Sequence, residues 1–159
     1  MSLWVADAGP LIFLAKLDRL NLLGNEDIRV PAAVMMEIGA KADEACKRIE
    51  QAANTWIKVQ EVTNRETVQL LLAGLDLGEA EVIALAKEVN ADFVLLDDLD
   101  ARRFARRVGL SAIGTIGILL TARLKGDIPS LREEIARLQT HGFRISKFLL
   151  DEVLKTAGE

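Results

Sequence analysis

Short apolar runs alternate with longer stretches of helical periodicity along most of the chain. The apolar runs are brief enough to be strands buried on both faces of a parallel sheet, and they lie at Leu3–Ala6, Ile28–Val30, Ile57–Val62, Phe93–Leu96 and Ser111–Ile113. The spacing of apolar residues between and after these runs predicts helices over Pro10–Leu17, Pro31–Gly39, Asp43–Asn54, Thr67–Leu75, Asp76–Val89, Asp98–Val108, Gly114–Lys125, Ser130–Thr140 and Ser146–Thr156. Strands that alternate with helices are typical of right-handed crossover units, so the pattern predicts an α/β domain with a parallel sheet covered on both faces.

The composition fits one well-cored domain and disfavours several other classes of protein. Half of the 159 residues are hydrophobic, and the formal net charge of −4 gives no bulk attraction to nucleic acid. The longest uncharged apolar stretch, Gly109–Ala122, is shorter than the roughly 20 residues of a bilayer-spanning helix. The single Cys46 and single His141 offer little basis for a disulfide, a zinc site or a histidine-based nucleophile. We therefore expect a soluble, cytoplasmic protein without a membrane segment.

Acidic residues follow two of the expected strands directly. Asp7 comes after the first strand, and Asp97 and Asp98 come after the fourth. Ligands of parallel sheets gather beyond the carboxyl ends of the strands, so these acids are expected at one edge of the sheet. Asp98 has an alternative role as the cap of the following helix, which favours Asp97 as the site residue.

Further acids lie on the expected helices. Glu37 stands among apolar neighbours, where an acid either reaches the surface or faces something positive. Glu79 and Glu81 are about 200° apart on a regular helix, so only one of them can serve the same site. The apolar stripe of that helix lies closer to Glu79, which makes Glu79 the better candidate, although both could be ordinary first-turn acids.

Carboxylates packed closely together repel each other unless cations neutralise them. Oxygen-only ligands suit Mg²⁺ or Mn²⁺ rather than zinc. A site of this kind can activate water and stabilise a phosphodiester under attack. The candidate catalytic residues are Asp7, Glu37, Glu79 and Asp97, and the candidate metal ligands are Asp7, Asp97, Glu79 and Asp98.

Basic and hydroxyl side chains near the acids are candidates for binding a substrate. Arg102, Arg103 and Arg106 follow the acid pair on one helix, where they form either a solvated face or a set of phosphate contacts. Thr115 stands at a strand-to-helix turn, where its hydroxyl could meet phosphate or a bound water, or could simply cap the helix.

An ordered set of motifs resembles the PIN domain, and most closely the PIN-like proteins related to VapC-type toxins of prokaryotic toxin–antitoxin pairs. The motifs are Val5-Ala6-Asp7-Ala8-Gly9-Pro10-Leu11-Ile12, Pro31-Ala32-Ala33-Val34-Met35-Met36-Glu37-Ile38, Leu77-Gly78-Glu79-Ala80-Glu81, Leu95-Leu96-Asp97-Asp98, Ala101-Arg102, Ile113-Gly114-Thr115-Ile116-Gly117 and Gly142-Phe143-Arg144-Ile145-Ser146. They occur in the family's order and cover nearly the whole chain.

The resemblance implies one domain over residues 1–159, a three-layer α/β/α fold with a five-stranded parallel sheet of order 3-2-1-4-5, on which the helices of residues 130–157 pack. It further implies a metal-dependent ribonuclease that is often dimeric and, among the toxins, is inhibited by an antitoxin. Asp7 and Asp97 would be metal ligands, Glu37 and Glu79 would complete the acidic pocket, and Thr115 would support it. The leading hypothesis is thus a Mg²⁺- or Mn²⁺-dependent endoribonuclease.

Two non-catalytic alternatives compete with that hypothesis. The first is a degenerate PIN-like module that binds RNA or a partner protein without cleaving. The second is a receiver-like phosphoacceptor domain, which also gathers acids at strand ends but needs a lysine after its last strand. Ile113-Gly114-Thr115 stands at that place, so the receiver-like reading is disfavoured.

Overall fold

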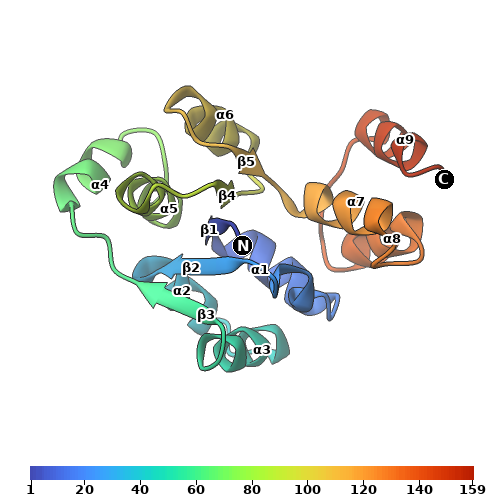
Figure 1. Ribbon diagram of the computed structural model, residues 1–159, viewed down its shortest axis with the longest axis horizontal. Coiled ribbons are helices and arrows are strands. Elements are labelled where there is room, and N and C mark those ends of the chain that lie inside the picture. Colours follow the sequence, from blue (N-terminus) through green and yellow to red (C-terminus); the bar gives the residue numbers. More distant parts are fainter.

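The computed structural model describes residues 1–159 and has a five-stranded parallel sheet at its centre (Figure 1). The strands are β1 (Leu3–Ala6), β2 (Asp27–Pro31), β3 (Ile57–Gln60), β4 (Phe93–Leu95) and β5 (Ala112–Ile113). Their order across the sheet is β3-β2-β1-β4-β5. This confirms the predicted fold class and strand order. β1 is the central strand, and its Val5 and Ala6 are fully buried.

Helices cover both faces of the sheet. They are α1 (Ala8–Lys16), α2 (Ala32–Gly39), α3 (Glu44–Ala53), α4 (Arg65–Leu71), α5 (Leu77–Val89), α6 (Leu99–Arg107), α7 (Thr115–Lys125), α8 (Leu131–Thr140) and α9 (Lys147–Thr156). In Figure 1, α1, α2 and α3 lie on one side of the strands, and α4, α5 and α6 lie on the other. None of the helices has the length and apolar character needed to cross a membrane.

Capping residues set where most helices begin. Asp43 accepts a hydrogen bond from the amide of Cys46 at the start of α3, and Ser146 does the same for Leu149 at the start of α9. α4 begins two residues earlier than the apolar pattern predicted, because Asn64 caps its first turn. The first helix ends at Lys16 and is followed by a separate 3₁₀ turn, Leu20–Leu23.

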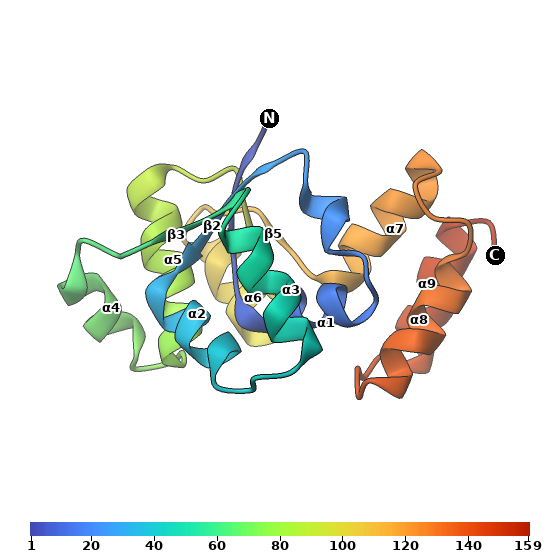
Figure 2. The same ribbon diagram turned by 90° about the horizontal axis from the view of Figure 1, so that it is seen from below.

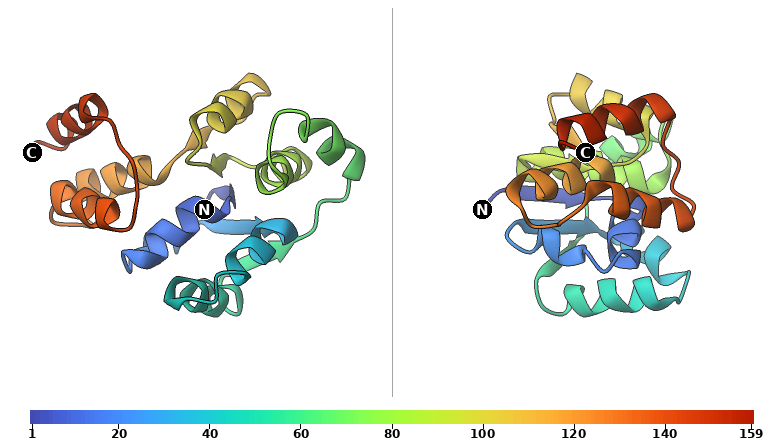
Figure 3. Two further views of the ribbon diagram at one scale, coloured as in Figure 1. Left: turned by 180° about the vertical axis from the view of Figure 1, so that it is seen from behind. Right: turned by 90° about the vertical axis from the view of Figure 1, so that its right-hand side faces the viewer.

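The three C-terminal helices form the end of the molecule remote from α4 (Figures 2 and 3). Buried Glu134 of α8 joins this end to the body, because it accepts hydrogen bonds from Arg19 (2.7 Å) and from Arg137 (3.2 Å). Glu159 ties α9 back to α8 by accepting from the amide of Leu131 at 2.7 Å. α7, α8 and α9 are therefore linked by polar contacts as well as by apolar packing.

Glu81 is a structural residue. The sequence placed it away from the apolar stripe of its helix, but the structure buries it. Its side chain accepts hydrogen bonds from the amide of Ala33 (3.0 Å) and from Arg65 (2.7 Å), and the residue is only 4% exposed. The stripe was misleading because α2 and α4 both pack on α5, so that α5 is buried on more than one face. Glu81 thus connects three helices and lies outside the acidic site.

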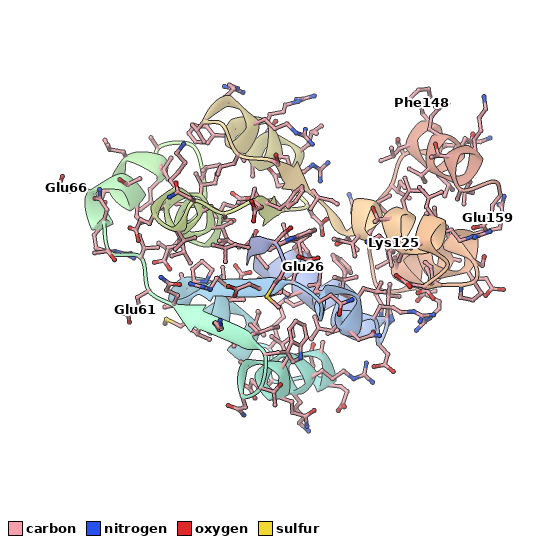
Figure 4. The ribbon with its side chains drawn as sticks, viewed as in Figure 1. Glu26, Glu61, Glu66, Lys125, Phe148 and Glu159 are labelled. Atoms are coloured by element: carbon pink, nitrogen blue, oxygen red, sulfur yellow. The ribbon has the colours of Figure 1, made fainter.

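Replacing Glu81 by Ala should lower the free energy of unfolding by about 2 kcal/mol, because the amide of Ala33 loses its buried acceptor. Urea denaturation followed by circular dichroism measures the loss. Glu66→Ala is the matched control, because Glu66 is an exposed acid on α4 that makes no side-chain hydrogen bond and points outward in Figure 4. Equal effects of the two substitutions would contradict the structural role of Glu81.

Candidate active site

Asp7 and Asp97 lie at the carboxyl ends of two neighbouring central strands. β1 and β4 pair in parallel, with Ala6 opposite Leu95. The backbone amide of Asp7 donates to the carbonyl of Leu95 at 3.0 Å, so the first acid stands directly beside the end of β4. Asp97 follows two residues after Leu95. The sheet register therefore brings both predicted strand-end acids to one edge.

Asp97 is held by the first residue of α7. Its Oδ1 accepts the backbone N–H of Thr115 at 2.7 Å, and its Oδ2 accepts the Thr115 hydroxyl at 2.7 Å. Nη1 of Arg102 donates to the backbone carbonyls of Asp97 (2.8 Å) and Leu96 (3.1 Å). Burial raises the pKa of Asp97 above its usual value, while the bonds from Thr115 and the charge of Arg102 oppose that rise. The carboxylate is fixed in direction and poorly solvated.

Asp7 is the most strongly perturbed acid of the site. Its pKa is raised to about 7, mainly by burial, and the hydrogen bond from the amide of Ala8 (2.9 Å) only partly offsets this rise. The negative charges of Asp76, Glu37 and Glu79 make smaller contributions to the raised value. These three acids come from α2 and from the start of α5, so separate elements direct negative charge toward one carboxyl group.

Glu79 occupies the first turn of α5 in a capping box with Asp76. The Asp76 side chain accepts the amide of Glu79 at 2.8 Å, and the Glu79 side chain accepts the amide of Asp76 at 3.2 Å. Burial raises the pKa of Glu79, and the charges of Asp76, Asp98 and Glu37 add to the rise. Glu79, rather than Glu81, thus shares the electrostatic environment of Asp7.

Asp76 also belongs to the cluster, although it was not among the acids predicted from the sequence. A signal was present in the sequence, because Asp76 and Glu79 have the spacing of a helix capping box. Asp98, a predicted metal ligand, is used as the N-cap of α6, where its Oδ2 accepts the amide of Ala101 at 2.8 Å. Its charge nevertheless reaches Glu79. The preference for Asp97 over Asp98 agrees with this division of roles.

Two glycines allow the backbone to approach the acids closely. A Cβ at Gly78 would lie 3.2 Å from Oδ1 of Asp7, a tight contact that would press on this carboxylate at the start of α5. A Cβ at Gly114 would lie 2.7 Å from Nη1 of Arg102 and 2.9 Å from Oδ1 of Asp97. Any larger residue at Gly114 would displace the groups that hold Asp97.

The three predicted substrate-binding arginines separate in space. Arg102 and Arg106 line a groove that ends at Asp97, and Arg106 donates to the carbonyl of Ala112 at 3.2 Å. Arg103 is not part of that groove and lies 3.7 Å from Asp100, an exposed ion pair along the helix. The contact of Arg103 with substrate therefore stays a prediction.

Thr115 was predicted to contact substrate and, by the resemblance, to support the acidic site, and the structure places its side chain against Asp97. The residue is fully buried, and its hydroxyl is donated to Asp97. It does not cap the helix either, because Gly114 is the N-cap of α7 and no side chain caps that end. Its position next to a buried carboxylate makes Thr115 a positioning residue for Asp97.

The donor chemistry of the cluster fits a hard divalent cation. Every candidate ligand is a carboxylate, and magnesium sites commonly use one or two carboxylates together with waters and substrate phosphates. In the side-chain conformations of the structure, no three acidic, histidine or cysteine residues are grouped closely enough to hold a metal ion. Asp7 and Asp97 are the pair best placed to share one, since both end neighbouring strands and both have raised pKa values that a cation would relieve.

The fold is thus a parallel α/β sheet of order β3-β2-β1-β4-β5 with acids at its carboxyl edge. A family model described as a PIN domain matches residues 3–159, and the chain belongs to the PIN-domain family. PIN domains are generally nucleases, that is hydrolases, and they typically use divalent metal ions. No curated protein matches the chain.

Proposed function

We propose that this protein is a divalent-metal-dependent endoribonuclease that hydrolyses phosphodiester bonds in RNA. The observation that supports this most directly is the convergence of negative charge from Glu37, Asp76 and Glu79 on half-buried Asp7, close to Asp97 beyond the end of the next strand. Such repulsion costs stability unless the site binds a cation. A purely structural role gives no reason to keep this group of like charges at the edge of the sheet where ligands bind.

Asp7 and Asp97 would hold Mg²⁺ or Mn²⁺ in the proposed mechanism. A bound divalent cation there would supply Lewis-acid activation of water and neutralise charge on the phosphate. Thr115 keeps both oxygens of Asp97 in a fixed orientation. Glu79 is half-buried with a raised pKa, which suits a group that accepts the proton of the attacking water as the phosphorus–oxygen bond to the leaving group breaks. Exposed Glu37 adds negative charge near Asp7 and Glu79.

We expect the purified protein to cleave single-stranded RNA in Mg²⁺ or Mn²⁺ and to lose that activity in EDTA. Asp7→Asn should lower cleavage on the order of 10³-fold or more, because one ligand charge is lost. Gel analysis of a labelled oligonucleotide measures the rate. Asp43→Asn is the matched control, because Asp43 caps α3 and is not part of the acidic cluster.

Cleavage that survives Asp7→Asn would refute the proposed mechanism. Isothermal titration with Mn²⁺ adds an independent measurement. Absence of Mn²⁺ binding together with retained RNA binding would instead identify a non-cleaving RNA-binding module.

We further propose that the protein acts as the toxin of a toxin–antitoxin pair and forms a homodimer. The resemblance to VapC-type proteins supports both suggestions, and α9 carries the exposed apolar side chains of Phe148 (77%) and Leu149 (42%). Phe148 points away from the molecule in Figure 4. We expect light scattering to show a dimer that Phe148→Glu weakens at unchanged circular dichroism; a monomeric wild type would refute the dimer.

A further inference from the structure

A groove of about 350 Å³ leads away from Asp97 between α6, the start of α7, and α9 with the loop before it. Two of the elements that line it, α6 and α9, flank the junction of β5 and α7 in Figure 1. Asp97 is the only acidic residue that lines it. The groove therefore begins at the acidic site and continues over a surface of different character.

Three arginines give the groove a positive charge. They come from two separate parts of the chain, Arg102 and Arg106 from α6 and Arg144 from the loop before α9. Arg102 is already bonded to backbone carbonyls, and Arg106 uses one of its nitrogens on a carbonyl. Arg144 is exposed and makes no hydrogen bond or ion pair. Its guanidinium is thus free to bind an anion.

The rest of the lining is apolar. The opposite walls consist of aliphatic side chains of α7 and α9, namely Ile116, Leu120, Leu149 and Val153. Phe143 anchors the loop that carries Arg144, since its ring packs edge-on against Phe13 of α1 with the centroids 5.1 Å apart. An apolar slot and a positively charged rim next to the acids suit a ligand that has both an apolar face and a negative charge.

We propose that this groove holds the nucleotide of single-stranded RNA that adjoins the scissile phosphate, with Arg144 on the backbone phosphate and the base against Ile116, Leu120 and Leu149. The proposal rests on the proposed ribonuclease function and names the form of its substrate. The volume is at the lower end of the range for pockets that enclose a small ligand, about 300–1,000 Å³, which matches one nucleotide. A base in a duplex is stacked and paired and cannot enter such a slot without leaving the helix.

The lining also predicts how selective the groove is. It contains no Asn, Gln, Ser or Thr side chain, and Asp97 is its only acidic group. Hydrogen bonds that distinguish one base from another are therefore scarce, and contact of the base with an apolar wall tolerates every base. Single-stranded RNA should be bound with little sequence preference at this position.

The test measures RNA binding separately from cleavage. A fluorescent single-stranded hexanucleotide is titrated by anisotropy into protein that carries Asp7→Asn, so that no turnover occurs. Adding Arg144→Ala should weaken binding about tenfold, the loss expected for one charged contact with a phosphate. The slope of log affinity against log salt should also fall by about 0.7, because one fewer phosphate of a single strand is neutralised. A duplex of the same length should not compete.

Lys155→Ala is the matched control, since it removes the same charge from the far end of α9, and Lys155 does not line the groove. The side chain of Arg144 is exposed and makes no hydrogen bond or ion pair, so its loss should leave the unfolding curve unchanged. A photoreactive uridine in the oligonucleotide should crosslink to residues 143–149.

Equal affinities and salt slopes for the Arg144→Ala and Lys155→Ala proteins would overturn the assignment of the groove, and so would crosslinks that map elsewhere. If Arg144→Ala abolished self-association and left RNA affinity unchanged, the groove would be an interface with a second copy of the chain. That result would also overturn the proposal. These outcomes leave the ribonuclease proposal intact, because that proposal is decided by metal-dependent cleavage.

Discussion

Asp7→Asn should stabilise the metal-free protein at pH 8 by up to about 4 kcal/mol while it removes nuclease activity. The pKa of Asp7 is raised by burial, and then by neighbouring acids, from 3.8 to about 7. Each unit of difference between the native and unfolded pKa is worth about 1.36 kcal/mol. Asn carries no charge, so the variant does not pay the free energy of ionising a carboxyl group at this poorly solvated position. A residue that weakens the apo fold is expected where function requires charge.

The pH dependence follows from the direction of that shift. Between about pH 4 and pH 7 the native state binds the proton of Asp7 more tightly than the unfolded state does, so the wild type loses stability as pH rises through this window. The gain from Asp7→Asn should be below about 1 kcal/mol at pH 4 and largest at pH 8. Urea unfolding in EDTA at pH 4, 6 and 8 measures both curves.

Divalent metal should reverse the ranking of the two proteins. Mn²⁺ that binds only the native state stabilises it by RT ln(1 + [Mn²⁺]/Kd), so it should raise the melting temperature of the wild type, more at pH 8 than at pH 6, and do little for Asp7→Asn. Asp43→Asn, at a helix cap outside the cluster, should show neither effect. If Asp7→Asn destabilises the metal-free protein at pH 8, the repulsion inferred for this site does not exist.

Much of the fold could be predicted from the sequence because local patterns decide it. Leu3–Ala6 and Phe93–Leu95 form strands where short apolar runs end in acids, and the parallel alignment of strand ends then places Asp7 beside Asp97. The order of the strands is different in kind. Local patterns do not determine it, and here it came from the resemblance to a family.

The surroundings of Glu81 and Arg144, which the sequence did not reveal, depend on which helices meet. Glu81 is buried because Arg65 of α4 and the start of α2 both reach it, a neighbourhood that the periodicity of α5 alone cannot reveal. Arg144 gains its place near Asp97 because α9 returns to the groove after α8. Such contacts between elements distant in sequence need the three-dimensional packing.

Thr115→Val should lower cleavage roughly 10- to 100-fold without unfolding the protein. Val has nearly the shape of Thr, so packing at this buried position is retained, but Oδ2 of Asp97 loses its 2.7 Å hydrogen bond. Residues that orient a metal ligand typically contribute this much to affinity or activity. The backbone amide of Thr115 still donates to Oδ1, so the carboxylate is loosened rather than released.

The pH profile of cleavage distinguishes this positioning role from a general packing defect. Burial raises the pKa of Asp97, and the Thr115 hydroxyl is one of the contacts that oppose the rise. Without that hydroxyl the Asp97 carboxylate should ionise at higher pH. The acidic limb of the plot of rate against pH should therefore shift to higher pH in Thr115→Val. Thr115→Ser keeps the hydroxyl and should restore both the rate and the position of the limb. A Ser variant as impaired as the Val variant would show that the methyl group of Thr115, rather than its hydrogen bond to Asp97, is what the site requires.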